Sequence, residues 1–211
     1  QTVYDAIVAA GGNRTKTGLI GEIPASAYAG TESSFSSYGD AAIYVMSRFG
    51  GEEGDLNHGL QGDWQEGPAG VPELSLHEEE IDTVNMVRDS GAFHKIIVVI
   101  NSGYAMDLGW LGDYGVDACL WVGYPGNYGM TGVAQALLGQ ADPSGRNVIT
   151  YATDSLSSAA MQNAGDFTFD NLTGLYKNKY LVYAEGIYVG YKYYETRYQD
   201  QVLGINNAAG A

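Results

Sequence analysis

A short acidic segment holds the side chains of this sequence that are best suited to chemistry. Glu52, Glu53 and Asp55 place three carboxyl groups within four residues, and His58 and Trp64 follow in the same stretch. Carboxyl and imidazole groups can transfer protons, and an indole ring can support a flat ligand. A plainer interpretation has the carboxylates and His58 facing water and Trp64 packing the segment onto its domain. The segment is therefore a candidate site with a structural alternative.

Alternating strands and helices are predicted to position this segment. Apolar patterns predict strands at 41–46, 95–101 and 118–122, helices at 3–10, 75–92, 128–138 and 155–163, and an extended stretch at 180–194. Ser75 is expected to cap its helix, with Glu78 three residues later. The alternation predicts an α/β fold, a three-layer α/β/α sandwich with a mostly parallel sheet. Such sheets carry their sites at the carboxyl ends of strands, where the acidic segment begins.

The composition is that of an acidic globular chain. Its 211 residues give a formal net charge of −15, and 45% of them are hydrophobic. This length predicts a single domain over residues 1–211 that needs no metal or disulfide to fold. The charge argues against nucleic acid and against an anionic membrane surface as partners, and it suits a neutral ligand. No membrane-spanning run and no signal peptide at Gln1 are evident, which favours a cytoplasmic location.

Other catalytic chemistries find little support. No nucleophile elbow or phosphate-binding glycine motif is present, the histidines are scattered, and neither a metal nor a cofactor is expected. Cys119 lies in an apolar run that predicts a buried structural thiol. Asp107 and Asp117 flank strand ends, where a catalytic acid is conceivable but a cap on a turn or helix is commoner. Trp110 and Trp121 lie in apolar contexts that predict core positions.

Four segments in order carry a family resemblance. They read Val-Ile-Asn-Ser-Gly-Tyr-Ala-Met-Asp-Leu at 99–108, Leu-Trp-Val-Gly-Tyr-Pro-Gly at 120–126, Ala-Asp-Pro-Ser-Gly-Arg at 141–146 and Tyr-Ala-Glu-Gly-Ile-Tyr-Val-Gly-Tyr-Lys-Tyr-Tyr at 183–194. Together they resemble family 3 glycoside hydrolases, the β-glucosidase family. The family's acid/base motif, Ser-Arg-x-x-Gly-Glu-Gly-x-Asp, is matched by Ser47, Arg48, Gly51, Glu52 and Asp55.

The resemblance implies a fold and a role for the acidic segment. The fold is the family's second domain, an (αβ)6 sandwich with about six strands in a flavodoxin-like topology. The role is that of Glu52 as the acid/base of a retaining β-glycosidase. Glu53 stands where the family has glycine, so Glu53 is a second candidate for this role. Arg48, Glu53, Asp55, His58 and Trp64 are expected to bind substrate or to support the segment.

The resemblance also implies parts that lie elsewhere. The family's nucleophile is an aspartate on a separate (β/α)8 barrel, which 211 residues are too few to include. We therefore expect a β-glucosidase-like domain fragment without the barrel and fibronectin-like domains, inactive alone. Its partners would be β-linked glucosides or oligosaccharides and the barrel of the same parent enzyme. A non-catalytic carbohydrate-binding or structural module is the alternative.

Overall fold

The computed structural model describes residues 3–11, 32–48, 73–163, 167–169, 171 and 179–198. Internal contacts divide the chain into two compact units. The first comprises Gln1–Phe49, Leu76–Tyr104 and Trp110–Arg146, and the second comprises Gly50–Ser75, Ala105–Gly109 and Asn147–Ala211. The expected single domain over residues 1–211 stays a prediction.

A parallel sheet forms the centre of the first unit. Its strands are β1 (Ala42–Ser47), β2 (Ile96–Asn101) and β3 (Ala118–Trp121), in the order β1-β2-β3. The register aligns Met46 with Ile100 and Ile100 with Trp121, so the three strands end at one edge. Each predicted strand is confirmed to within one residue. The α/β fold is thus confirmed, whereas the sheet of about six strands and its flavodoxin-like topology stay predictions.

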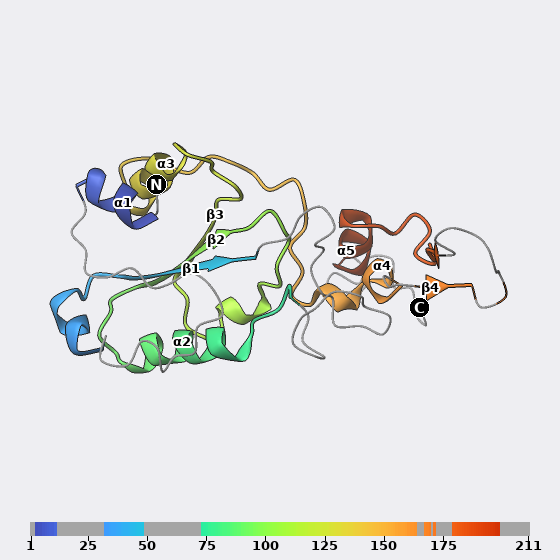
Figure 1. Ribbon diagram of the computed structural model, residues 1–211, viewed down its shortest axis with the longest axis horizontal. Helices are drawn as coiled ribbons and strands as arrows, with labels where there is room; N and C mark the ends of the chain where they lie inside the picture. Colours follow the sequence, from blue (N-terminus) through green and yellow to red (C-terminus); the bar gives the residue numbers. More distant parts are fainter. Residues whose placement is uncertain are drawn as a thin grey trace. The chain divides into compact units, whose positions relative to one another are not determined.

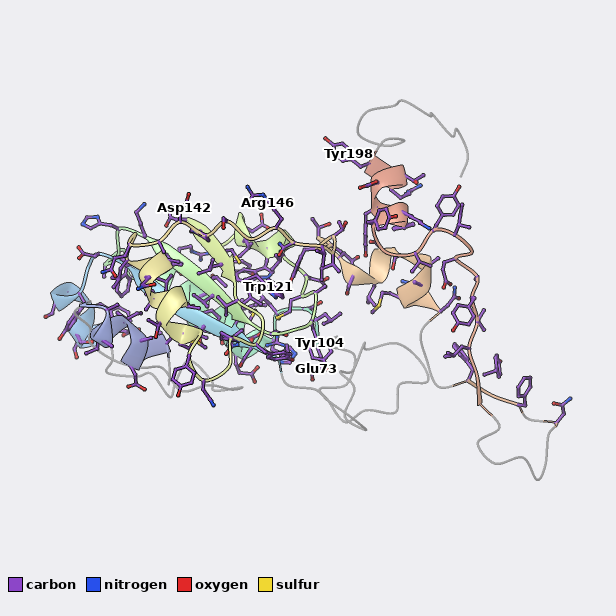
Figure 2. All side chains as sticks on the ribbon, turned by 90° about the horizontal axis from the view of Figure 1, so that it is seen from above. Glu73, Tyr104, Trp121, Asp142, Arg146 and Tyr198 are labelled. Carbon is purple, nitrogen blue, oxygen red and sulfur yellow. The ribbon has the colours of Figure 1, made fainter. Side chains whose placement is uncertain are left out.

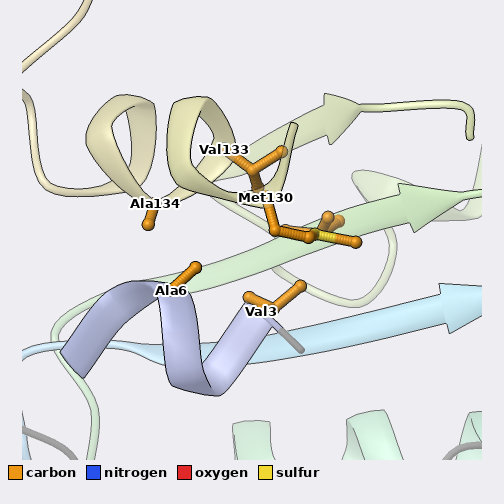
Figure 3. Close-up of a cluster of buried hydrophobic side chains, with 6 residues drawn as sticks. Val3, Ala6, Met130, Val133 and Ala134 are labelled. Carbon is orange, nitrogen blue, oxygen red and sulfur yellow. The ribbon is translucent and has the colours of Figure 1, made fainter. Parts of the chain in front are cut away.

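Helices cover both faces of this sheet. Figure 1 shows α1 (Val3–Ala9) and α3 (Met130–Leu137) on one face and α2 (Glu78–Asp89) on the other. Figure 3 shows side chains of α1 and α3 meeting over the sheet, where they form a buried cluster of Val3, Ala6, Met130, Val133 and Ala134 with Val99 of β2. Met130, Val133, Ala134 and Leu137 follow helical spacing, which gives α3 its apolar stripe. Val98 and Val99 point to opposite faces and are both fully buried, which explains the uninterrupted apolar run of β2.

The start of α2 differs from the prediction by three residues. The acidic run Glu78, Glu79 and Glu80 does occupy the first turn, where the helix dipole favours negative charge. The N-cap, however, is His77, whose backbone N–H donates to Glu80 Oε2 at 2.9 Å. The predicted Ser75 cap is wrong because the Ser75 hydroxyl donates to Asp107 Oδ2 at 2.8 Å instead.

Short elements make up the described part of the second unit. They are η4 (Ser155–Ser157), α4 (Ala159–Gln162), the antiparallel pair β4 (Phe167–Thr168) and β5 (Lys179–Tyr180), and α5 (Tyr191–Tyr198). The extended stretch predicted for 180–194 is wrong beyond Tyr180. Gly186 and Gly190 take left-handed backbone angles, with φ of 58° and 57°, and these turns lead into α5.

Two short 3₁₀ turns, η2 (Glu32–Ser37) and η3 (Gly109–Leu111), complete the described elements. Within the described ranges, no helix has the length and apolar character needed to cross a membrane.

Candidate functional site

One of the predicted site residues, Arg48, lies in the described structure. Glu52, Glu53, Asp55, His58 and Trp64 lie outside the described residues. The stretch from residue 49 to residue 72, which contains them, is called the Glu52 loop below. Arg48 is the last described residue before this loop, so its contacts show how the protein holds the chain where the loop begins.

Arg48 is anchored by a buried ion pair. It directly follows the last residue of β1 and is 7% exposed. Its Nη1 and Nη2 donate to Glu80 Oε1 and Oε2, each at 2.7 Å, and Nη1 also donates to the Ser47 carbonyl at 3.0 Å. This two-pronged geometry matches the planar guanidinium to the carboxylate. Arg48 thereby ties the carboxyl end of β1 to the first turn of α2.

Glu80 connects the ion pair to the start of α2. The same Oε2 that accepts from Arg48 also accepts from the backbone of His77, which is 3% exposed. A carboxylate that receives several charged or backbone donors is fully engaged although it is buried. No local sequence pattern around Arg48 or around the acidic run at 78–80 predicts this pairing.

The turns that follow β2 and β3 are joined by hydrogen bonds. The Asn101 side chain donates from Nδ2 to the Gly123 carbonyl at 2.6 Å, and the Trp121 indole donates from Nε1 to the Ser102 carbonyl at 2.8 Å. The Tyr104 backbone N–H donates to Ser102 Oγ at 3.1 Å. Figure 2 labels Trp121 and Tyr104 among the side chains of this region. The turn after β2 lies next to the end of β1, and the turn after β3 lies one strand further along the same edge of the sheet.

The predicted burial of Trp121 and Cys119 is wrong. Trp121 is 41% exposed and Cys119 is also exposed. Their register partners on β2 are covered, since Val98 and Ile100 are both 0% exposed. Within the described residues β3 pairs with β2 alone and forms an edge of the sheet. The packing that buries Val98 and Ile100 does not extend over Cys119 and Trp121.

The two aspartates beside strand ends act as anchors. Asp117 Oδ2 accepts the Ile96 backbone N–H at 2.8 Å, at the start of β2. In the second unit, Asp107 accepts from the Ser155 backbone N–H at 2.6 Å and from the Ser75 hydroxyl at 2.8 Å. Burial raises the pKa of Asp107, while these hydrogen bonds act in the opposite direction. Both residues therefore have the turn-supporting role that was the commoner of the two predicted for them.

The described residues contain no group of three or more histidine, cysteine, aspartate or glutamate side chains that could hold a metal ion. The expectation that the domain needs no metal or cofactor stays a prediction.

A parallel sheet with helices on both faces defines an α/β domain. The chain belongs to the family described as the glycosyl hydrolase family 3 C-terminal domain, whose family model matches residues 1–191. This confirms the resemblance drawn from the four segments.

The chain is similar to part of several β-glucosidases. It is 29% identical to the β-glucosidase of Ruminococcus albus over 163 residues, which cover 77% of this chain and 15% of that protein. It is 27% identical to the β-glucosidase of Rhizobium radiobacter over 139 residues, with 66% of this chain and 16% of that protein covered. The chain thus spans about a sixth of the length of these relatives.

A solved structure gives the same assignment. The structure of β-glucosidase 3B from Thermotoga neapolitana in complex with α-D-glucose matches with a TM-score of 0.56 and 25% sequence identity. The match covers 86% of this chain and 23% of that chain. The glycoside hydrolase, glycosidase and β-glucosidase descriptions from the sequence are therefore confirmed at the level of family.

Proposed function

We propose that this chain is the acid/base-carrying domain of a retaining β-glycosidase that hydrolyses terminal β-linked sugars, with Glu52 as the acid/base. Membership of the family and the β-glucosidase relatives support the reaction class. The match of Glu52 to the family's acid/base motif supports the residue. In this proposal the domain is a three-layer sandwich of about six strands over residues 1–211, and it works with a (β/α)8 barrel of the same enzyme.

The anchoring of Arg48 is the structural observation that carries the proposal. Arg48 is buried against Glu80 at the carboxyl end of β1. Glu52 follows four residues later, and four residues span at most about 14 Å. A carboxyl group on so short a tether stays near the edge of the sheet where α/β domains bind ligands. The ion pair would thus limit the space that the acid/base can explore.

The reaction needs two carboxyl groups with different duties. In a retaining glycosidase they lie about 5–5.5 Å apart, one attacking the anomeric carbon and the other serving first as acid and then as base. We assign the second duty to Glu52, which would protonate the departing glycosidic oxygen and later deprotonate the incoming water. The attacking aspartate would come from the barrel. Like-charge repulsion from Glu53 and Asp55 would keep Glu52 protonated before the first step.

The test is chemical rescue in the complete enzyme that carries this domain. Glu52→Ala should slow hydrolysis of an alkyl β-glucoside by about 100- to 10,000-fold, because the leaving group then departs unprotonated. With an activated aryl β-glucoside, azide should restore turnover and yield a β-glycosyl azide, since azide attacks the glycosyl-enzyme without a base.

Glu53→Ala is the matched control, because it removes a carboxyl from the neighbouring position. It should keep most activity and should gain nothing from azide. Azide rescue of Glu53→Ala together with near-normal activity of Glu52→Ala would transfer the role to Glu53. Glycosyl azide formation by either variant would exclude a non-catalytic carbohydrate-binding or structural module.

A further inference from the structure

Two aromatic side chains stand exposed at the carboxyl end of β3. Trp121 is 41% exposed and Tyr124, in the turn that follows, is 62% exposed. Both belong to the first unit, at the same sheet edge from which the Glu52 loop departs. Exposed aromatic rings at such an edge are candidates for ligand binding, because a ligand that covers them would remove their apolar surface from water.

Both rings are held in place by glycines. A Cβ added to Gly103 would lie 2.5 Å from Tyr124 Cε2, so the tyrosine ring occupies the space above that glycine. A Cβ added to Gly123 would lie 3.1 Å from Trp121 Cζ2, and Gly123 has a φ of 57°. The Trp121 indole is further fixed by its hydrogen bond to the Ser102 carbonyl. Each ring thus packs one side onto backbone and leaves the rest in solvent.

The anchor points of the two rings are adjacent in the chain. The Trp121 indole bonds to Ser102 and the Tyr124 ring packs on Gly103, so the two rings contact consecutive residues of one turn. Asn101 also joins the two turns, through the hydrogen bond that its Nδ2 donates to the Gly123 carbonyl. Fixed rings lose little conformational freedom when a ligand binds, which favours recognition.

The chemistry around the rings selects a small neutral ligand with a flat apolar face and a polar rim. The rings contact Ser102, Gly103 and Gly123, which offer no apolar core of the kind that a protein interface has. The chain carries a formal charge of −15, which disfavours polyanions. A pyranose ring has the required C–H face and the required hydroxyl rim.

We propose that Trp121 and Tyr124 form a stacking platform for a pyranose ring of a neutral β-linked oligosaccharide. The proposal rests on the proposed function, because it assigns the platform to the substrate of the same enzyme. It adds a binding site on β3 and its turn to the acid/base placed on the loop after β1.

The test is a titration of the ¹⁵N-labelled 211-residue chain with cellobiose, followed by the indole N–H signals of its tryptophans in NMR. The Trp121 signal is assigned by its loss in Trp121→Phe. Cellobiose should shift the Trp121 signal saturably, whereas mannitol, an acyclic polyol without a ring face, should not. Tyr124→Ala should weaken the affinity by about tenfold, and Tyr124→Phe, which keeps the ring, by less than about threefold.

Tyr128→Ala is the matched control, since Tyr128 is 87% exposed and lies four residues beyond Tyr124. It should leave the affinity unchanged. If circular dichroism shows that Tyr124→Ala fails to fold, Tyr124→Leu keeps the apolar bulk without an aromatic face and should show the same loss. Equal shifts with mannitol, no shift of the Trp121 signal, or unchanged affinity without the Tyr124 ring would each overturn the platform.

Failure here is separable from failure of the proposed function. The titration of the 211-residue chain measures binding at Trp121 and Tyr124 without any turnover, so its outcome does not depend on the catalytic role of Glu52. Azide rescue in the complete enzyme tests Glu52 without reference to Trp121. If another protein domain covers the platform in the complete enzyme, cellobiose will shift the Trp121 signal in the 211-residue chain but not in the complete enzyme. That result would overturn the role of the platform as a substrate site.

Discussion

At the scale of single residues, the Arg48–Glu80 pair determines how the chain leaves β1. Both side chains are less than 10% exposed, so neither charge has water as an alternative partner. An ion pair of this kind adds little compared with an apolar pair of similar volume, but losing one member leaves a buried charge. The pair therefore contributes mainly by fixing where the chain leaves β1. The proposed acid/base requires that this point be fixed.

Arg48→Met is predicted to lower the free energy of unfolding by about 3–5 kcal/mol, because Glu80 would remain buried without its cation. Urea unfolding measures the change. Arg88→Met is the control, since the Arg88–Asp89 pair is exposed and its loss should cost less than about 1 kcal/mol. The double variant Arg48→Met with Glu80→Met should recover much of the loss. Equal effects of the two arginine changes would contradict the burial argument.

Asp107 is predicted to make stability depend on pH in a defined direction. Burial raises the pKa of Asp107 above its ordinary value, so the folded protein binds this proton more tightly than the unfolded chain. The resulting stability is fully present below about pH 3.9 and is lost as pH rises through the raised pKa. The stability of the unaltered protein minus that of Asp107→Asn should therefore fall from about pH 4 upward.

Urea unfolding of both proteins at a series of pH values tests this prediction. Asparagine retains an oxygen that can accept the Ser155 N–H, so the variant keeps one anchoring bond at every pH. A stability difference that stays constant or grows with rising pH would show that Asp107 ionises freely in the folded protein.

The sequence is sufficient to propose a residue for the chemistry but not to predict what supports it. Glu52 could be proposed because its motif is contiguous. The partner of Arg48 lies 32 residues away on another element, and no local pattern connects the two. Glu80 lies in the first helical turn, where the dipole alone gives a carboxylate sufficient reason to be present.

At the scale of elements, the sheet could be predicted from apolar runs, but its boundary could not. β2 and β3 have similar apolar sequences, yet β2 is covered on both faces while Trp121 and Cys119 of β3 are exposed. An apolar run reports that a strand can be buried and does not report how many neighbours it has. Likewise, β-favouring tyrosines suggested an extended 180–194, and left-handed glycines there start a helix instead.

Close approach of α1 and α3 yields a third prediction. Ala134 is fully buried beside Ala6, and a larger side chain has no free volume to occupy. Ala134→Leu should lower the free energy of unfolding by about 1–3 kcal/mol. Gln135→Leu introduces the same side chain at the neighbouring, exposed position and should change stability by less than about 0.5 kcal/mol. Thermal or urea unfolding compares the two, and equal losses would point to a general effect of leucine on α3.

At the scale of the whole molecule, the chain spans about a sixth of the length of its β-glucosidase relatives. Retaining hydrolysis needs two carboxyl groups on opposite sides of the scissile bond. The proposed function assigns one of these, the attacking aspartate, to a barrel of the same enzyme. In this proposal the chain can fold and bind sugar by itself, whereas hydrolysis requires the chain together with the barrel.

The 211-residue chain alone is therefore predicted to show no turnover that depends on Glu52. Release of nitrophenol from an aryl β-glucoside should proceed at the same background rate with the unaltered chain and with Glu52→Gln. Both proteins should have the same circular dichroism spectrum, which excludes misfolding as the cause. A faster rate with the unaltered chain would mean that a second catalytic carboxyl lies within these residues.

Cys119 on β3 offers a practical route into the assembly question, with labelling at alkaline pH because partial burial raises the pKa of its thiol. Cys119 is the only cysteine in the sequence, so a maleimide dye or nitroxide would attach at one defined place on the sheet. Its emission or mobility would change when a neighbouring domain approaches that strand. The same thiol can couple two copies through an intermolecular bridge in air, so samples of the chain call for a reductant until the label is in place.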